Sequence, residues 1–165
     1  MDFNTFANEV RSNLNKYSKN PWSGTLLEEY YALTPKPKGC VGELLVGDIL
    51  ANLGYTIENR TDAGHDYLVN GVPTEVKFAL TVDRNDKYEC IFNHIGFKKS
   101  WEQIILCCVN GDLNLRMVLY TKEQLAQMML SRQQGGKDGE NDDFMTSGKK
   151  SAALLFSDKA IVLME

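Results

Sequence analysis

The stretch that decides the fold of this 165-residue chain is residues 64–78, which read GHDYLVNGVPTEVKF. Asn70-Gly71 is a strong signal for a two-residue turn, and apolar side chains recur on both sides of it. The stretch therefore predicts a β-hairpin, with one strand over 67–69 and the other over 72–78.

The register of this hairpin is predicted to bring acidic side chains together. Counting outward from the turn places Asp66 directly opposite Glu75, in a non-hydrogen-bonded pair with Cα atoms about 4.5 Å apart. Lys77 shares a face with Glu75 because strand side chains alternate. Like charges in opposed positions destabilise a hairpin unless a cation lies between them. Lys77 supplies part of that charge, and Mg²⁺, which prefers carboxylate oxygens, would supply the rest. The alternative is a solvated face with one surface ion pair.

The flanking regions predict further helices and strands. Helices precede the strands, and helical segments interrupt the strands later, which favours an α/β fold with a central mixed β-sheet flanked by α-helices. A Thr121–Gln124 capping box predicts the start of a helix that runs to about residue 130. The other expected helices cover 26–33 and 38–53, and the other expected strands cover 55–58, 88–93, 104–109, 113–120 and 160–164.

Composition narrows the classes of partner. Lys and Arg number 18 against 22 Asp and Glu, a net charge of -4, which excludes binding of nucleic acid through overall positive charge but not through a local basic face. The sequence contains no apolar run of about 18 residues and no signal peptide at its start, so we expect a cytoplasmic protein without a membrane partner. The four cysteines lack metal-site spacing and are expected to be reduced and buried: Cys40, Cys90, Cys107 and Cys108.

The length fits a single domain over residues 1–165. We expect a helical lead-in over 1–37 and a core over 38–120. A polar, Gly-rich segment over 131–150 is predicted to be a mobile loop, and loops of this length are often functional. It is a candidate for contacting DNA or for exchange between subunits.

The ordered motifs resemble the PD-(D/E)xK nuclease superfamily, the fold of many restriction endonucleases. The resemblance covers about residues 38–120. It departs from the literal motif in having His65 where the family name has Pro, and His65 is expected to pack in a loop rather than act in catalysis. The segments that carry the resemblance are Gly39–Glu43, Gly64–Asp66, Glu75–Lys77, Cys90–Ile95 and Trp101–Leu106.

The resemblance implies a role for each residue of the motif. Asp66 and Glu75 would be metal ligands for Mg²⁺, with Mn²⁺ as a substitute and the Val76 carbonyl as a third ligand. Lys77 would orient or deprotonate the attacking water and offset charge on the phosphate. Glu43 would bind a second ion or a metal-bound water.

The implied function is a metal-dependent endodeoxyribonuclease that cleaves double-stranded DNA to leave 5′-phosphates, in the first place a type II restriction endonuclease. Such enzymes act as homodimers on palindromic sites, so a homodimer is expected. The alternatives are a structure-specific or repair nuclease, such as a junction resolvase, and a non-catalytic DNA- or protein-binding module on the same fold. The candidate DNA contacts are Arg60, Asn93, His94, Lys98 and Lys99.

Overall fold

The structure is a computed structural model, and it describes residue 8 and residues 20–130 and 143–165. The chain divides into two compact units, Met1–Thr34 and Pro35–Glu165. The described part of the first unit holds helix α2 (Glu28–Ala32), which is shorter than the helix predicted over 26–33. The rest of the predicted lead-in lies outside the described residues, apart from the helical residue 8.

The larger unit is built on a six-stranded mixed sheet, as predicted. Neighbouring strands are antiparallel except for the central pair β3–β5, which is parallel. A separate two-stranded sheet joins β4 (Ile95–Gly96) to β7 (Asp143–Phe144). The strands of the large sheet are, in spatial order, β1 (Ile57–Asn59), β2 (Tyr67–Val69), β3 (Val72–Leu80), β5 (Gln103–Val109), β6 (Leu115–Thr121) and β8 (Ile161–Met164).

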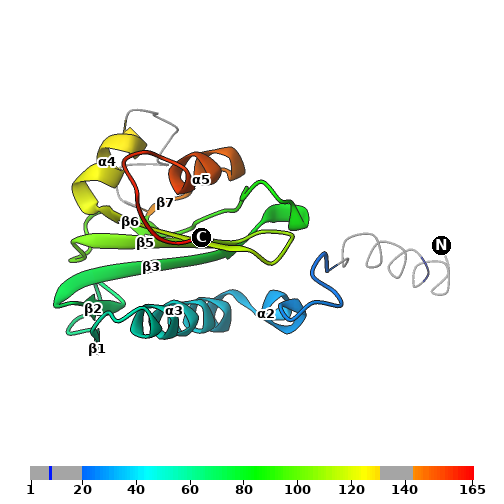
Figure 1. Cartoon of the computed structure of the whole chain (residues 1–165), viewed down its shortest axis with the longest axis horizontal. Coiled ribbons are helices and arrows are strands. Elements are labelled where there is room, and N and C mark those ends of the chain that lie inside the picture. The colour runs from blue at the N-terminus through cyan, green and yellow to red at the C-terminus, as the bar shows by residue number, and fades with distance from the viewer. Residues whose placement is uncertain (1–7, 9–19, 131–142) are drawn as a thin grey trace. The chain divides into compact units, whose positions relative to one another are not determined.

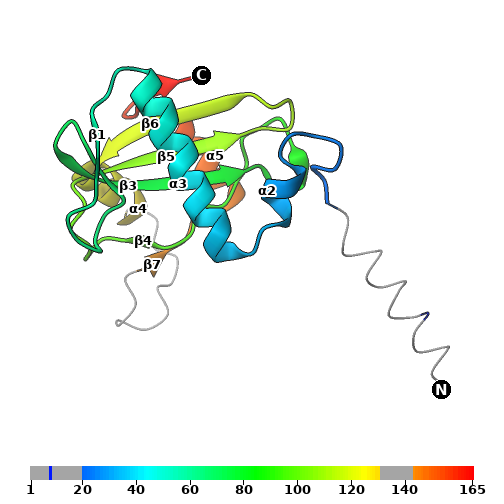
Figure 2. The same cartoon turned by 90° about the horizontal axis from the view of Figure 1, so that it is seen from below.

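Helices cover both faces of the large sheet (Figures 1 and 2). Helix α3 (Pro35–Asn52) lies on one face, and α4 (Lys122–Leu130) and α5 (Gly148–Leu155) lie on the other. Strand β5 packs against both layers because its side chains alternate. Ile104, Leu106 and Cys108 join the cluster with α4 and α5, and Ile105 and Cys107 join the cluster with α3. The prediction that this strand is covered on both faces is confirmed.

The hairpin forms with the predicted turn and register. Asn70 and Gly71 have φ of 50° and 79°, as a tight hairpin turn requires. Tyr67 pairs with Thr74 across the two strands. The Asn70 side chain also accepts a 2.8 Å hydrogen bond from the backbone N–H of Thr56, which attaches the turn to the segment before β1.

The predicted capping box begins helix α4. The N–H of Gln124 donates to Oγ1 of Thr121 at 3.2 Å, and the N–H of Thr121 donates to the Gln124 side chain at 2.9 Å. Two of the N–H groups at this helix start are therefore satisfied by side chains.

The connection between β3 and β5 differs from the prediction. The strand expected over 88–93 is not formed, and after the short 3-10 helix η1 (Val82–Arg84) the chain runs irregularly to β4. Phe92 exchanges hydrogen bonds with Thr146, so this segment is held by the chain before α5 rather than by the sheet. Cys90 and Phe92 are apolar because they fill the core, which explains the strand-like pattern.

Three further expectations concern the Gly-rich loop, the cysteines and membrane-spanning helices. Residues 131–142 of the predicted Gly-rich loop lie outside the described residues, but the loop does not extend to 150, because α5 begins at Gly148. Cys40 is exposed, whereas the other three cysteines are buried and free as predicted. In the described part of the chain, no helix is long and apolar enough to span a membrane.

Candidate active site

Asp66 lies just before β2, where the hairpin ladder becomes irregular. Its N–H donates to the Thr74 carbonyl at 3.0 Å, although Thr74 is already the ladder partner of Tyr67. Two residues thus oppose one, which is the arrangement of a β-bulge. The Asp66 carboxylate takes the next position in the ladder, and its Oδ2 accepts the N–H of Val76 at 2.7 Å. The predicted ladder pair of Asp66 with Glu75 is therefore not formed, because the bulge redirects the Asp66 side chain.

Glu75 is a buried carboxylate held by two lysines. Its residue exposure is 2 %, and its Oε1 accepts from Nζ of Lys77 at 2.6 Å and from Nζ of Lys99 at 3.1 Å. Burial of a carboxylate is costly unless it is paired and hydrogen-bonded. Lys77 and Glu75 share a face of β3, as predicted, whereas Lys99 comes from the turn before β5.

The backbone of β3 exposes alternate groups at its two edges. The N–H of Thr81 donates to the carbonyl of Val109 in β5, and the carbonyl of Pro73 accepts from the N–H of Glu102, just before β5. Odd-numbered residues of β3 therefore face the β5 edge. Val76 faces the opposite edge, since its N–H bonds to Asp66. The N–H and C=O of one strand residue point to the same side, so the Val76 carbonyl also faces this edge. Beyond Thr74 the ladder with β2 has ended, and this edge carries the site.

Glu43 reaches the site from helix α3. The helix lies close to β3 at the preceding residue, where a Cβ on Gly42 would be 2.8 Å from Cβ of Phe78. Burial raises the pKa of Glu43, and the negative charges of Asp66 and Glu75 raise it further, while Lys77 and Arg60 lower it. The charges of both hairpin carboxylates therefore act on Glu43, which is expected of a residue that lies near them.

Asp66 has the same electrostatic signature. Burial is the main cause that raises its pKa, and the charge of Glu75 adds to the rise. The N–H of Val76 and the charges of Lys77 and Lys99 lower the pKa in part. Perturbed carboxyl pKa values of this kind cluster at functional sites, although structural ion-pair networks also produce them.

Tyr67 also borders the site, which the sequence reasoning did not foresee. Its ring lies against α3 at Gly47, where an added Cβ would be 3.2 Å from the phenol oxygen. Burial raises the pKa of Tyr67, and the charges of Glu43, Asp66 and Asp48 contribute. The position of Tyr67 directly after Asp66 is the feature of the sequence that could have predicted this, but an aromatic residue in a strand more often serves packing alone.

His65 lies in the loop before β2 and contacts residues of that loop and Ser100 rather than the carboxylates of the site. It is buried, its Nε2 accepts the N–H of Thr61 at 3.3 Å, and its Nδ1 lies 3.2 Å from Asp62 and 3.3 Å from Ser100. Because Nε2 is an acceptor, the ring proton belongs on Nδ1. His65 thus ties the loop before β2 to the turn that carries Lys99, which agrees with the loop role expected for it.

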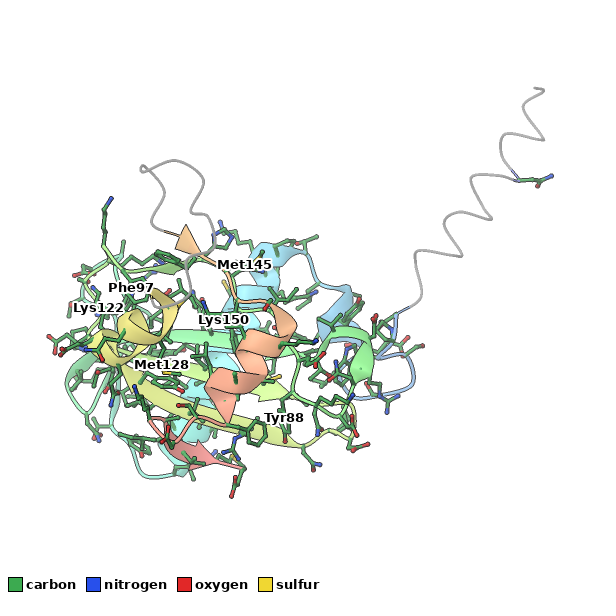
Figure 3. All side chains as sticks on the ribbon, turned by 90° about the horizontal axis from the view of Figure 1, so that it is seen from above. Tyr88, Phe97, Lys122, Met128, Met145 and Lys150 are labelled. Carbon is green, nitrogen blue, oxygen red and sulfur yellow. The ribbon has the colours of Figure 1, made fainter. Side chains whose placement is uncertain are left out.

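The other candidate DNA contacts are exposed. Arg60 follows β1 and is near enough to lower the pKa of Glu43, while Asn93 and His94 precede β4. Lys98 is exposed beside the half-buried Lys99. Figure 3 shows where this turn lies: Phe97, the residue before Lys98, is at the same end of the molecule as Lys122, on the side of the sheet that carries α4.

The donor atoms suit a hard divalent cation. Among the described residues, the hydrogen bonds of Asp66 and Glu75 engage Oδ2 and Oε1, which leaves the second oxygen of each carboxylate for a cation. In the same part of the chain, no group of three or more His, Cys, Asp or Glu side chains is placed to hold a metal ion. Mg²⁺ usually takes one or two carboxylates with water and phosphate oxygens, so this set fits Mg²⁺ without a complete protein cage.

Comparison of the sequence with protein-family models and with curated proteins gives no match. The assignment of function therefore depends on the residues of the site and their geometry.

Proposed function

We propose that this protein is a Mg²⁺-dependent endodeoxyribonuclease, and we favour a type II restriction endonuclease over the alternatives. The observation that supports this most is the gathering of Glu43, Asp66, Glu75 and Lys77 at the edge of β3 left open by β2. These residues come from a helix and a hairpin, in the order that the resemblance to PD-(D/E)xK nucleases implies.

The charge balance of the site favours a bound cation. The site holds three carboxylates and two lysines. Burial raises the pKa values of Glu43 and Asp66, and repulsion from neighbouring carboxylates raises them further. A bound Mg²⁺ supplies an activated water and offsets the charge that develops on the phosphate. Asp66 and Glu75 would hold the ion, with the Val76 carbonyl at the same edge, and Glu43 would bind a second ion or a metal-bound water, as the resemblance implies.

Lys77 is the residue proposed to act on the water. Its ammonium is fixed by Glu75 at 2.6 Å and its side chain is only 17 % exposed, so it has little freedom to move. A fixed ammonium orients an attacking water oxygen and stabilises the negative charge that develops on the phosphate. Hydrolysis would then break the bond to the 3′ oxygen and leave a 5′-phosphate, as the resemblance implies.

Plasmid cleavage tests the proposal directly. We expect purified protein to cut plasmid DNA with Mg²⁺ or Mn²⁺ and to lose this activity in Asp66→Asn, Glu75→Gln and Lys77→Met. Glu58→Gln is the matched control, because Glu58 is an exposed glutamate on β1. Absence of cleavage with either metal, or equal cleavage by Asp66→Asn and the control, would refute the catalytic proposal.

The products separate the alternatives. Discrete fragments indicate a sequence-specific enzyme, and preference for branched DNA indicates a structure-specific or repair nuclease. Binding of DNA or protein without cleavage, unchanged in Asp66→Asn, indicates a non-catalytic module. The homodimer remains a prediction, which sedimentation velocity can test on the same preparation.

A further inference from the structure

Lys99 approaches the site from a different element and from the solvent side. Its Nζ lies 3.1 Å from Oε1 of Glu75, the oxygen that also accepts from Lys77 at 2.6 Å. The Glu75 side chain is 2 % exposed, whereas the side chains of Lys77 and Lys99 are 17 % and 38 % exposed. Lys99 is therefore the one of these three groups with the most access to a substrate that comes from solution.

The turn that carries Lys99 is held in place on both sides. Nζ of Lys122 donates to the Lys99 carbonyl at 2.5 Å and lies 4.9 Å from the centre of the Trp101 ring. Ser100 donates to both carboxylate oxygens of Asp62, at 2.8 and 3.0 Å. The backbone at Lys99 is thus fixed, and the long side chain is the part that can change partner.

We propose that Lys99 is a phosphate-binding residue whose ammonium exchanges between Glu75 and the DNA. In the metal-free protein it neutralises Glu75, and a divalent cation that binds Glu75 repels it. Lys99 then moves to a phosphate oxygen of the substrate, because it is the more exposed of the two lysines, while Lys77 stays beside Glu75. This inference rests on the proposed nuclease function and adds to it a coupling between metal and substrate.

The coupling makes opposite predictions for the two ligands. Removal of the ammonium takes away a competitor for Glu75, so a metal should bind more tightly to Lys99→Met. The same change removes a contact to phosphate, so DNA should bind more weakly when metal is present. Coupling between two ligands is reciprocal, so metal should strengthen DNA binding less in Lys99→Met than in the wild-type chain.

Calorimetric titration with Mg²⁺ or Ca²⁺ alone measures the first effect. We expect Lys99→Met to bind the metal about fivefold more tightly than the wild type, which corresponds to about 1 kcal/mol. This is the scale of an ion pair that is partly open to solvent. Lys159→Met, at an exposed lysine before β8, should bind metal as the wild type does. DNA affinity with Ca²⁺ present should fall in Lys99→Met by about tenfold.

Amine acetylation of the wild-type chain gives a second readout that needs no variant. Modification of Lys99, measured by mass spectrometry, should rise when Mg²⁺ is added and fall again with DNA. The inference is refuted if Lys99→Met binds metal as tightly as the wild type or more weakly, or if acetylation of Lys99 does not change on addition of Mg²⁺. Neither result would refute the nuclease proposal. Absence of metal binding in both wild type and Lys99→Met refutes both.

Discussion

Two chemically identical substitutions on helix α3 should change stability in opposite directions. Gly42 and Gly39 both lie in this helix, where replacing Gly by Ala contributes about 1 kcal/mol of helix propensity. At Gly39 the nearest atom to an added Cβ is Oε1 of Glu43 at 3.9 Å, an ordinary contact. Gly39→Ala should therefore raise the free energy of unfolding by up to about 1 kcal/mol.

At Gly42 the added methyl group meets a fixed neighbour. Its Cβ would lie 2.8 Å from Cβ of Phe78, an atom attached directly to the β3 backbone that no rotation can move away. Overpacking of this kind costs about 1–3 kcal/mol, which exceeds the gain in propensity. Gly42→Ala should thus be less stable than Gly39→Ala by about 2 kcal/mol, and it should also shift Glu43 away from the hairpin.

Urea unfolding followed by circular dichroism measures this difference, and metal titration of the same two variants reports on Glu43. Gly42→Ala should bind Mg²⁺ more weakly than Gly39→Ala. If Gly42→Ala is as stable as Gly39→Ala, then α3 does not contact β3 as closely as the structure indicates, and the position assigned to Glu43 is wrong.

Three other predictions follow from the same contacts. The pKa values of Glu43 and Asp66 are raised in the folded state, so the stability of the metal-free protein falls as the pH rises past the pKa values of these groups. Glu43→Gln should therefore raise the melting temperature at pH 7 but not in acid. Equal shifts of the melting temperature at both pH values would contradict this. Gly64→Ala should reduce DNA cleavage, because its Cβ would lie 2.7 Å from the backbone nitrogen of Ser100 beside Lys99; unchanged cleavage would argue against a role for that turn. Thr121→Ala should lower the free energy of unfolding by about 1 kcal/mol through loss of the cap at the start of α4, and an unchanged midpoint of urea unfolding would contradict this.

The hairpin and the central strand could be predicted because their signals are local. The Asn70-Gly71 turn determines the register over its first pairs, and the unbroken apolar run in β5 indicates burial on both faces. The face-sharing of Glu75 and Lys77 followed from the alternation of β3 alone. Glu43 came from the family resemblance, and the structure places it within electrostatic reach of the hairpin.

What could not be predicted depends on contacts between distant segments. The bulge at Asp66 arises where the carboxylate replaces a backbone group in the ladder, and no sequence pattern marks that exchange. Cys90 and Phe92 look like strand residues because a core-filling loop has the same apolar spacing. The contact of Lys99 with Glu75 requires the parallel pairing of β3 with β5, whose partners are far apart in the sequence.

That parallel pairing also has a consequence for the order in which the site assembles during folding. The hairpin that carries Asp66, Glu75 and Lys77 closes over a two-residue turn, whereas the pairing of β3 with β5 closes the much longer connection from Thr81 to Glu102. Contacts between distant segments form more slowly because more chain entropy is lost before they are made. We therefore expect Asp66, Glu75 and Lys77 to come together early and Lys99 to arrive late, so the acidic charge of the hairpin is only partly neutralised until β5 has paired with β3.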